Sequence, residues 1–123
     1  MPDVLSAMRQ REKEQRRAQR APILVRVECK TPRIYIQAQG ENISETGMLI
    51  TCRETLPVSQ SVTLRFALPL AAGRNVAVST AAVVVRVERG RCMGVRFVGL
   101  RVAFQQAIAE YIERTGGLPA LSA

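Results

Sequence analysis

The sequence predicts an all-β-dominated domain: a six-stranded antiparallel β-barrel with a C-terminal α-helix and a basic N-terminal arm. Apolar and polar residues alternate with a period of two from Ile23 to Val98, and short turn signals containing Gly or Pro interrupt them. After Gly99 the period changes to that of a helix. A chain of 123 residues has room for one core. Six short strands and one helix suit a barrel plugged at one end, since closure leaves no exposed sheet edge.

The N-terminal arm comprises residues 1–20, which are polar and rich in Arg, Gln and Glu. Glu12 and Arg16 form an i,i+4 pair if the segment is helical, but its apolar positions are too few to fix it on a core. The sequence therefore allows either a helix or a mobile arm over these residues. Pro22 ends any helix, because the residue before a proline is disfavoured in the α region.

Alternation then predicts six strands, at residues 23–30, 34–40, 48–53, 62–68, 76–88 and 92–98. The long fifth strand is expected to bend near Ser79–Thr80, and Arg89–Arg91 forms the hairpin turn that follows it. The side chains that we expect in the core are Ile23, Val25, Val27, Cys29, Ile34, Ile36, Ala38, Met48, Ile50, Cys52, Val62, Leu64, Phe66, Leu68 and Phe97. Tyr35 is the aromatic residue that we expect to face outward.

The helix is predicted at residues 101–115. Its apolar stripe is made by Phe104, Ala107, Ile108, Tyr111 and Ile112. Gly116 and Gly117 end it, and the residues that follow are expected to fray.

Charge is the strongest feature of the composition. The formal net charge is +8, and all of the 18 basic residues except Lys13 and Lys30 are arginine. Arginine favours bidentate recognition and stacking on planar groups, so this bias indicates an anionic partner with planar or forked acceptors. A basic surface also suits nucleic acid or anionic lipid, and charge alone does not separate these classes. No apolar run reaches the length of a membrane span, and charges follow the first apolar residues too soon for a secretory signal.

The residues that support catalysis or metal binding are sparse. The chain has no His, which removes the commonest general base at neutral pH and a common zinc ligand. The carboxylates are scattered, and Cys29, Cys52 and Cys92 are far apart within strand-like runs. We therefore expect no enzyme activity, no metal site, and three reduced core cysteines of the kind found in cytoplasmic proteins.

Two short segments carry the recognition chemistry. Arg16, Arg17 and Arg20 form a cluster of planar cations that suits guanine edges, guanine faces or phosphate oxygens. Asn42 and Ser44 stand at alternating positions after Gly40, so we expect both to point the same way. Gly47 would matter through its missing side chain, by a left-handed conformation or by close packing. Together the segments favour the capture of an anionic purine nucleotide.

The order and spacing of these residues resemble the signature of the PilZ family, the bacterial receptor domains for cyclic di-GMP. Arg16 and Arg20 match its Arg-x-x-x-Arg part, and Asn42, Ser44 and Gly47 match its Asp/Asn-x-Ser-x-x-Gly part. Gly94–Phe97 is similar to the Gly-x-Arg-Phe strand that precedes the last helix of the family. Two positions depart from the commoner pattern: Thr46 stands where many members carry a second glycine, and Asn42 replaces Asp. Both changes are expected to lower affinity.

The resemblance spans residues 16–115, leaving 1–15 as an N-terminal extension, helical or mobile, and 116–123 as a flexible C-terminal tail. It implies a split-barrel type of fold and a cytoplasmic bacterial receptor that binds cyclic di-GMP and needs no cofactor. Such a receptor signals through ligand-dependent contacts with an effector protein. The implied ligand-binding residues are Arg16, Arg17, Arg20, Asn42, Ser44, Gly47 and Arg96. Arg96 is equally compatible with a solvated surface position.

Two alternatives remain from the sequence. The first is a PilZ-like adaptor that binds no nucleotide. The second is a basic β-barrel that binds nucleic acid, which is less favoured because base stacking needs several exposed aromatic residues on one sheet face.

Overall fold

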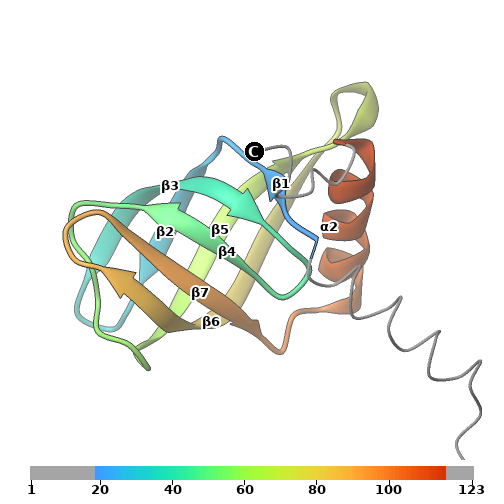
Figure 1. The fold of residues 1–123 in the computed structure, drawn as a ribbon. Coiled ribbons are helices and arrows are strands. Elements are labelled where there is room, and N and C mark those ends of the chain that lie inside the picture. Colours follow the sequence, from blue (N-terminus) through green and yellow to red (C-terminus); the bar gives the residue numbers. More distant parts are fainter. Residues whose placement is uncertain (1–18, 116–123) are drawn as a thin grey trace, which may run out of the picture.

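The computed structural model describes residues 19–115, which form a closed antiparallel barrel with one helix against it (Figure 1). The strand order is β1-β3-β2-β5-β6-β7-β4, and a further pairing between β3 and β4 closes the ring. The six strands of the barrel are β2 (Arg26–Lys30), β3 (Tyr35–Ile43), β4 (Gly47–Thr51), β5 (Ser61–Pro69), β6 (Asn75–Glu88) and β7 (Cys92–Val98). Three shorter or flanking elements complete the fold: β1 (Ala21–Pro22), the 3₁₀ turn η1 (Ala71–Gly73) and helix α2 (Val102–Arg114). The predicted six-stranded barrel with a C-terminal helix is therefore confirmed.

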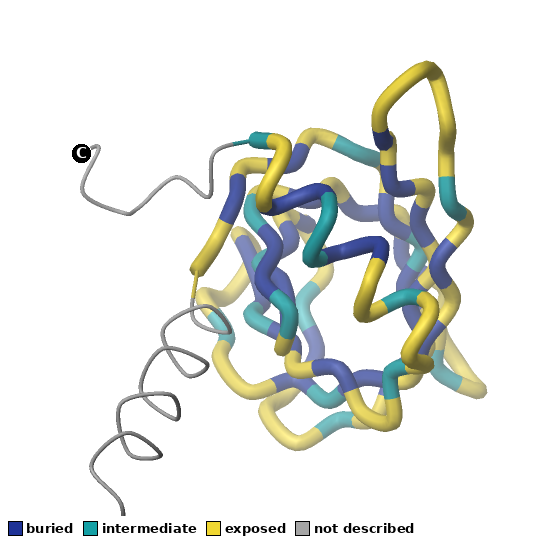
Figure 2. Tube along the Cα trace, turned by 90° about the vertical axis from the view of Figure 1, so that its right-hand side faces the viewer, coloured by how far each residue is buried: buried dark blue, intermediate teal, exposed yellow. Residues whose placement is uncertain are grey.

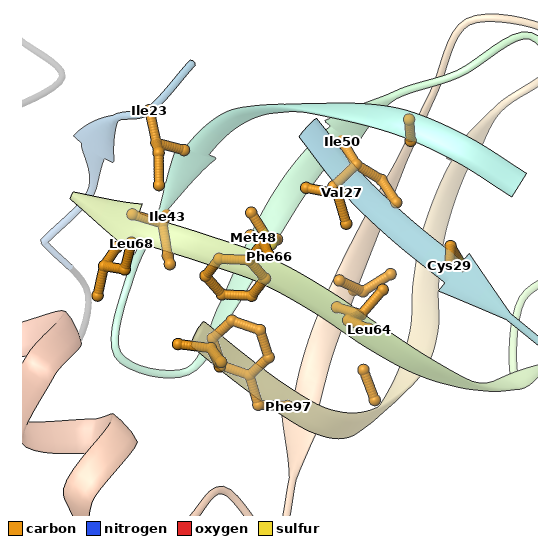
Figure 3. Packing of buried hydrophobic residues seen from close by; sticks show 14 of the residues in the cluster. Ile23, Val27, Cys29, Ile43, Met48, Ile50, Leu64, Phe66, Leu68 and Phe97 are labelled. Atoms are coloured by element: carbon orange, nitrogen blue, oxygen red, sulfur yellow. The ribbon is translucent and has the colours of Figure 1, made fainter. Parts of the chain in front are cut away.

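The core fills the inside of the barrel with the apolar residues that alternate along each strand (Figure 3). Strand β5 shows the pattern most regularly, because every second residue from Val62 to Leu68 is buried. The rings of Phe66 and Phe97 stack with their centroids 6.5 Å apart. An arrangement of this kind is worth about 0.5–1.5 kcal/mol beyond the area that it buries. The predicted outward position of Tyr35 is also confirmed.

Helix α2 lies against the barrel next to β5 and β6 and is turned toward the viewer in Figure 2. Its buried residues are Ala107, Ile108, Tyr111 and Ile112, while Phe104 is half-buried. The connection from β7 passes through Gly99, whose φ of 63° lies in the left-handed region that favours glycine. This turn ends the strand and lets the chain begin the helix three residues later.

Three details differ from the expectation. The first predicted strand begins at Arg26 rather than Ile23, although Ile23 is still buried. Ile34 is 39% exposed and precedes β3, because Thr31 Oγ1 accepts the backbone N–H groups of Arg33 and Ile34 and so extends the turn. The irregularity in β6 lies near Val85, where an unpaired residue interrupts the ladder and turns its side chain outward.

Candidate functional site

Strand β1 brings the two halves of the motif together. It pairs with the end of β3 in the register Ala21↔Ile43 and Pro22↔Asn42. Arg20 immediately precedes β1, and its Nη1 donates a hydrogen bond of 2.7 Å to Asn42 Oδ1 on the surface. Residues that are 22 positions apart in the sequence are thus in direct contact.

The segment that carries Arg20 is attached to the barrel at two points. The side chain of Ala21 is buried in the core. The carbonyl of Pro22 accepts a hydrogen bond of 2.6 Å from the Tyr111 hydroxyl of α2. We expected the arm through Arg20 to lack anchoring, whereas the structure holds its last residue at Asn42. Residues 1–18, including Arg16 and Arg17, and the predicted tail at 116–123 lie outside the described residues.

Ser44 does not point outward beside Asn42, contrary to our expectation. It is 1% exposed, and its Oγ accepts the backbone N–H groups of Thr46 and Gly47 at 3.2 Å each. The Thr46 hydroxyl lies 3.1 Å from the same oxygen. The side chain of Ser44 therefore shapes the turn between β3 and β4, and Asn42 is the motif residue whose side chain reaches the surface.

Gly47 is required by close packing rather than by a left-handed conformation. Its φ is not positive, but a Cβ atom at this position would lie 2.1 Å from the carbonyl oxygen of Val95. The turn is held from the same side by a backbone hydrogen bond of 2.8 Å from Phe97 to Thr46. The glycine thus lets β7 approach the turn that presents Asn42.

Arg96 lies next to this turn because β4 and β7 pair with Gly47 opposite Arg96. Its exposed side chain lines a cleft of about 370 Å³ together with Glu45, Thr46, Phe97, Gly99, Leu100 and Gln105. Asn42 and Arg96 are two strands apart and offset by two residues along the ladder. Their Cα atoms are therefore separated by roughly 12 Å, given the usual strand spacings.

The surface around these residues carries both signs of charge. Arg20 and Arg96 supply guanidinium groups, while Glu45 lines the cleft beside Arg96. The carboxylate of Glu41 accepts a hydrogen bond of 3.0 Å from the Thr51 hydroxyl. The arrangement suits an anionic ligand that is bound by arginine and forms a hydrogen bond, through a polar edge, with the side-chain amide of Asn42.

The three cysteines are buried and free of disulfides. Burial, with a smaller contribution from the neighbouring Cys52, raises the pKa of Cys29 to about 11. Burial is also the main cause of the raised pKa values of Cys52 and Cys92. The thiols are thus protonated at neutral pH and are poor nucleophiles.

Sequence reasoning missed two contributors to the site. Tyr111 was assigned only to the apolar stripe of the helix, yet its hydroxyl holds β1 in place. Gln105 lines the cleft of Arg96 from the first turns of α2. Nothing in the local sequence marks either residue, because both roles depend on how α2 sits against the barrel. Within residues 19–115, no group of three or more Cys, Asp or Glu is placed to hold a metal, and no helix there has the length and apolarity of a membrane span.

Comparison of the sequence with models of known protein families identifies the family to which this chain belongs. The family model of the PilZ domain matches residues 14–114, which is most of the chain. The chain belongs to the PilZ family. This agrees with the PilZ-like fold and with the position of the motif at the β1–β3–β4 junction. A search of curated protein sequences gave no significant match.

Several solved structures have a similar fold. The inhibitor of motility of Bacillus subtilis, MotI/DgrA, superposes with a TM-score of 0.70 at 24% identity, over 77% of this chain and 48% of that one. The PilZ domain of CeSA from a cellulose-synthesizing bacterium gives 0.52 at 15% identity, over 81% of this chain and 97% of that domain. The Borreliella burgdorferi PlzA protein in complex with cyclic di-GMP gives 0.57 at 13% identity, over 85% of this chain and 44% of that one. This PilZ chain therefore spans about half the length of MotI/DgrA and of PlzA.

Proposed function

We propose that this PilZ protein is a bacterial receptor for cyclic di-GMP that signals through ligand-dependent contacts with another protein. The observation that carries the proposal is the hydrogen bond between Arg20 and Asn42, which unites the two parts of the motif on one surface. The structure of PlzA in complex with cyclic di-GMP has a similar fold and supports the choice of ligand.

The Arg20–Asn42 pair is suited to a guanine nucleotide. A guanidinium has five N–H donors, and the contact with Asn42 uses one of them. Within residues 19–115 the remaining donors have no other hydrogen-bond partner, so they suit guanine N7 and O6 or a phosphate, and the contact with Asn42 orients the group. Asn42 accepts through Oδ1, so its NH₂ group is left to donate to the ligand. In contrast to an Asp, Asn42 leaves the positive charge of Arg20 uncompensated, and this opposes the lower affinity that the departure from Asp led us to expect.

In this proposal the guanidinium groups of Arg16, Arg17 and Arg20 contact the ligand from the arm. Asn42 forms a hydrogen bond with a base edge, and Arg96 contacts a phosphate or a base from β7. Ser44 and Gly47 act by shaping and packing the turn. The like charges of the arm are neutralised when the ligand bridges Arg16 to the barrel, and the arm then presents or hides a face for the effector.

Calorimetric titration of the full chain with cyclic di-GMP tests the proposal. Arg20→Ala should weaken binding about tenfold to a hundredfold, because a bidentate or stacked contact is worth roughly 1–3 kcal/mol. Arg65→Ala is the matched control: it removes the same charge from an exposed position on β5, which lies across the barrel from β4. Equal losses in the two variants would indicate diffuse electrostatics, and absence of binding to the unmodified chain would refute the proposal.

Hydrogen exchange tests the signalling step. Amides of residues 9–20 should gain protection when cyclic di-GMP binds. Equal protection with and without the nucleotide would show that the arm does not act as the switch, even if the nucleotide binds.

A second candidate, a PilZ adaptor that binds no nucleotide, is favoured by one observation. The Ser44 hydroxyl is used within its turn, and the Arg20–Asn42 contact forms without a ligand, so the fold around the motif is held with no nucleotide bound. The same titration separates the two candidates. We place either activity in the cytoplasm, a proposal supported by the three free cysteines.

A further inference from the structure

Strand β3 is paired on both sides along only part of its length. Residues Gln39–Ile43 lie between β4 on one side and β2 or β1 on the other. Residues 35–38 pair with β2 alone, because β4 ends at Thr51, opposite Gln39. Beyond that point the chain stays with β7, as the backbone bond from Cys52 N–H to the Arg91 carbonyl shows. Within the described part of the chain, this stretch of β3 is thus an open sheet edge.

The open edge presents backbone hydrogen-bonding groups. Successive residues of a strand direct their N–H and C=O groups to opposite sides. The N–H of Gly40 is donated to Val25, toward the β2 side. Because the direction alternates along β3, Ala38 and Ile36 face the β2 side as Gly40 does. The backbone groups of Gln37 and Tyr35 therefore face the opposite side, which lacks a strand. Sheet edges of this kind accept an extended peptide as an added strand.

A cleft of about 570 Å³ lies along this edge, and its walls are rich in arginine. Arg26 stands on one side, and Arg53 and Arg91 stand on the other. All three side chains are exposed. One carboxylate, that of Glu54, lines the cleft. Three others lie around it: Glu88 is 3.6 Å from Arg91 in an exposed pair of little strength, Glu41 accepts a hydrogen bond from the lining Thr51, and Glu28 is paired opposite Gln37. The residues that line the cleft, three arginines and one glutamate, carry a net positive charge.

The floor and rim of the cleft have different chemistry. The buried side chains of Ile36, Ala38 and Cys52 contribute to its floor, while Gln37 and the 48%-exposed Tyr35 stand at its rim. A strand inserted here would turn alternate side chains inward and outward. Small apolar side chains suit the inward positions, and carboxylates suit the outward ones beside the arginines.

The cleft is separate from the Arg20–Asn42 site. The turn between β6 and β7, which supplies Arg91, lies at the end of the barrel away from α2 (Figure 1). Strand β4 runs from Gly47 at one site to Thr51 at the other. At the usual rise per residue, the two ends of β4 are about 13 Å apart, while Leu49, which pairs with Asn42, lies about 7 Å from Thr51.

We propose that this cleft docks an acidic, extended segment of a partner protein, which pairs with residues 35–38 of β3 as an added strand. The open edge distinguishes this partner from nucleic acid, since a peptide backbone matches its alternating donors and acceptors. Single-stranded nucleic acid would instead need a row of stacking aromatics, and Tyr35 is the one aromatic residue that lines the cleft. The docking site locates the protein contact of the proposed function and does not require nucleotide binding.

The test is an NMR titration of the ¹⁵N-labelled full chain with the octapeptide Glu-Val-Glu-Thr-Glu-Val-Glu-Thr at up to millimolar concentration. We expect amide shifts at residues 35–39, Arg53 and Arg91, and slower hydrogen exchange at Gln37. The double variant Arg53→Glu, Arg91→Glu should weaken binding at least about tenfold, because like charges then face the peptide. The control variant Arg65→Glu, Arg114→Glu changes net charge equally at exposed positions that do not line the cleft, and should bind as the unmodified chain does.

Two control peptides separate strand addition from simple attraction. Replacing Glu by Lys removes the charge match, and replacing Val and Thr by Pro removes donors that strand pairing needs. Equal binding of either peptide, or shifts centred on Arg20, Asn42 and Arg96, would overturn the proposal. Tighter binding of an oligothymidylate at the same amides would also overturn it in favour of nucleic acid. If the chain binds the acidic peptide at this edge but does not bind cyclic di-GMP, the proposed receptor function is refuted and the proposed docking site is not.

Discussion

Replacing Gly47 by Ala should destabilise the domain by roughly 2–3 kcal/mol. The added Cβ would lie 2.1 Å from the Val95 carbonyl oxygen and 3.2 Å from the Arg96 Cα, both backbone atoms that cannot rotate away. A carbon usually approaches a carbonyl oxygen to about 3.3 Å, so β4 and β7 must separate by about 1 Å at this end. Overpacking of this kind costs about 1–3 kcal/mol, and the weakened ladder bonds add about 0.5–1.5 kcal/mol each. The reduced freedom of the unfolded chain offsets about 0.4–1 kcal/mol.

Urea unfolding followed by circular dichroism measures this loss as a midpoint lowered by roughly 1–2 M, with an unchanged slope. Gly94→Ala is the matched control, because it lies on the neighbouring strand and its Cβ would meet Arg86 Cβ at 3.5 Å, an ordinary contact. We expect Gly94→Ala to be neutral or slightly stabilising. Equal midpoints for the two variants would refute the packing argument. Loss of nucleotide binding by Gly47→Ala without loss of stability would show instead that the glycine serves the ligand directly.

Three further substitutions test two supports of the site, Ser44 and Tyr111, and the buried thiol of Cys29 in the core. Ser44→Ala should cost about 1–3 kcal/mol of unfolding free energy, because two backbone N–H groups lose their acceptor; a loss below about 0.5 kcal/mol would mean that the turn does not depend on this hydroxyl. Tyr111→Phe should cost about 0.5–1.5 kcal/mol and speed hydrogen exchange at Ala21, whereas unchanged exchange would show that β1 is held without Tyr111. The raised pKa of Cys29 means that the folded state keeps a proton that the unfolded state loses, so stability should fall as the pH rises from about 9 to about 11. Cys29→Val should flatten this fall in a series of urea titrations, and identical pH profiles would contradict the assignment.

Much of the barrel could be predicted from the sequence because strand β5 and its neighbours keep a strict period of two. The failures occur where a local interaction interrupts that period. Thr31 draws Ile34 into a turn, and an unpaired residue near Val85 interrupts a run of consecutive valines in which no alternation is visible. Neither interaction changes the hydrophobicity of the residues involved, so the pattern of apolar and polar residues does not reveal where the strand is interrupted.

The candidate site was predicted less completely, because its geometry depends on strand register. A register shift between Gly40 and Asn42 and the end of β3 at Ile43 place Ser44 inside the turn, although simple alternation put it beside Asn42. Arg96 could be assigned to an outward position, but its place beside Gly47 follows from the pairing of β4 with β7. The sequence also left two roles open for Gly47, and only the distance to β7 decides between them.

Strand β3 carries both proposed sites, and its irregularity bears on how they communicate. Asn42 stands after the register shift and contacts Arg20, while the open edge at residues 35–38 stands before it. A regular strand would transmit a displacement along its length, but a bulge absorbs it in local twist. A nucleotide at Asn42 should therefore leave the geometry of the edge largely unchanged, and effector control would come from the arm. In that case saturating cyclic di-GMP alters the affinity of the acidic peptide only in a chain that retains residues 1–15. A chain shortened by these residues keeps Arg16, Arg17 and Arg20 for the nucleotide, so the comparison separates control by the arm from control through β3.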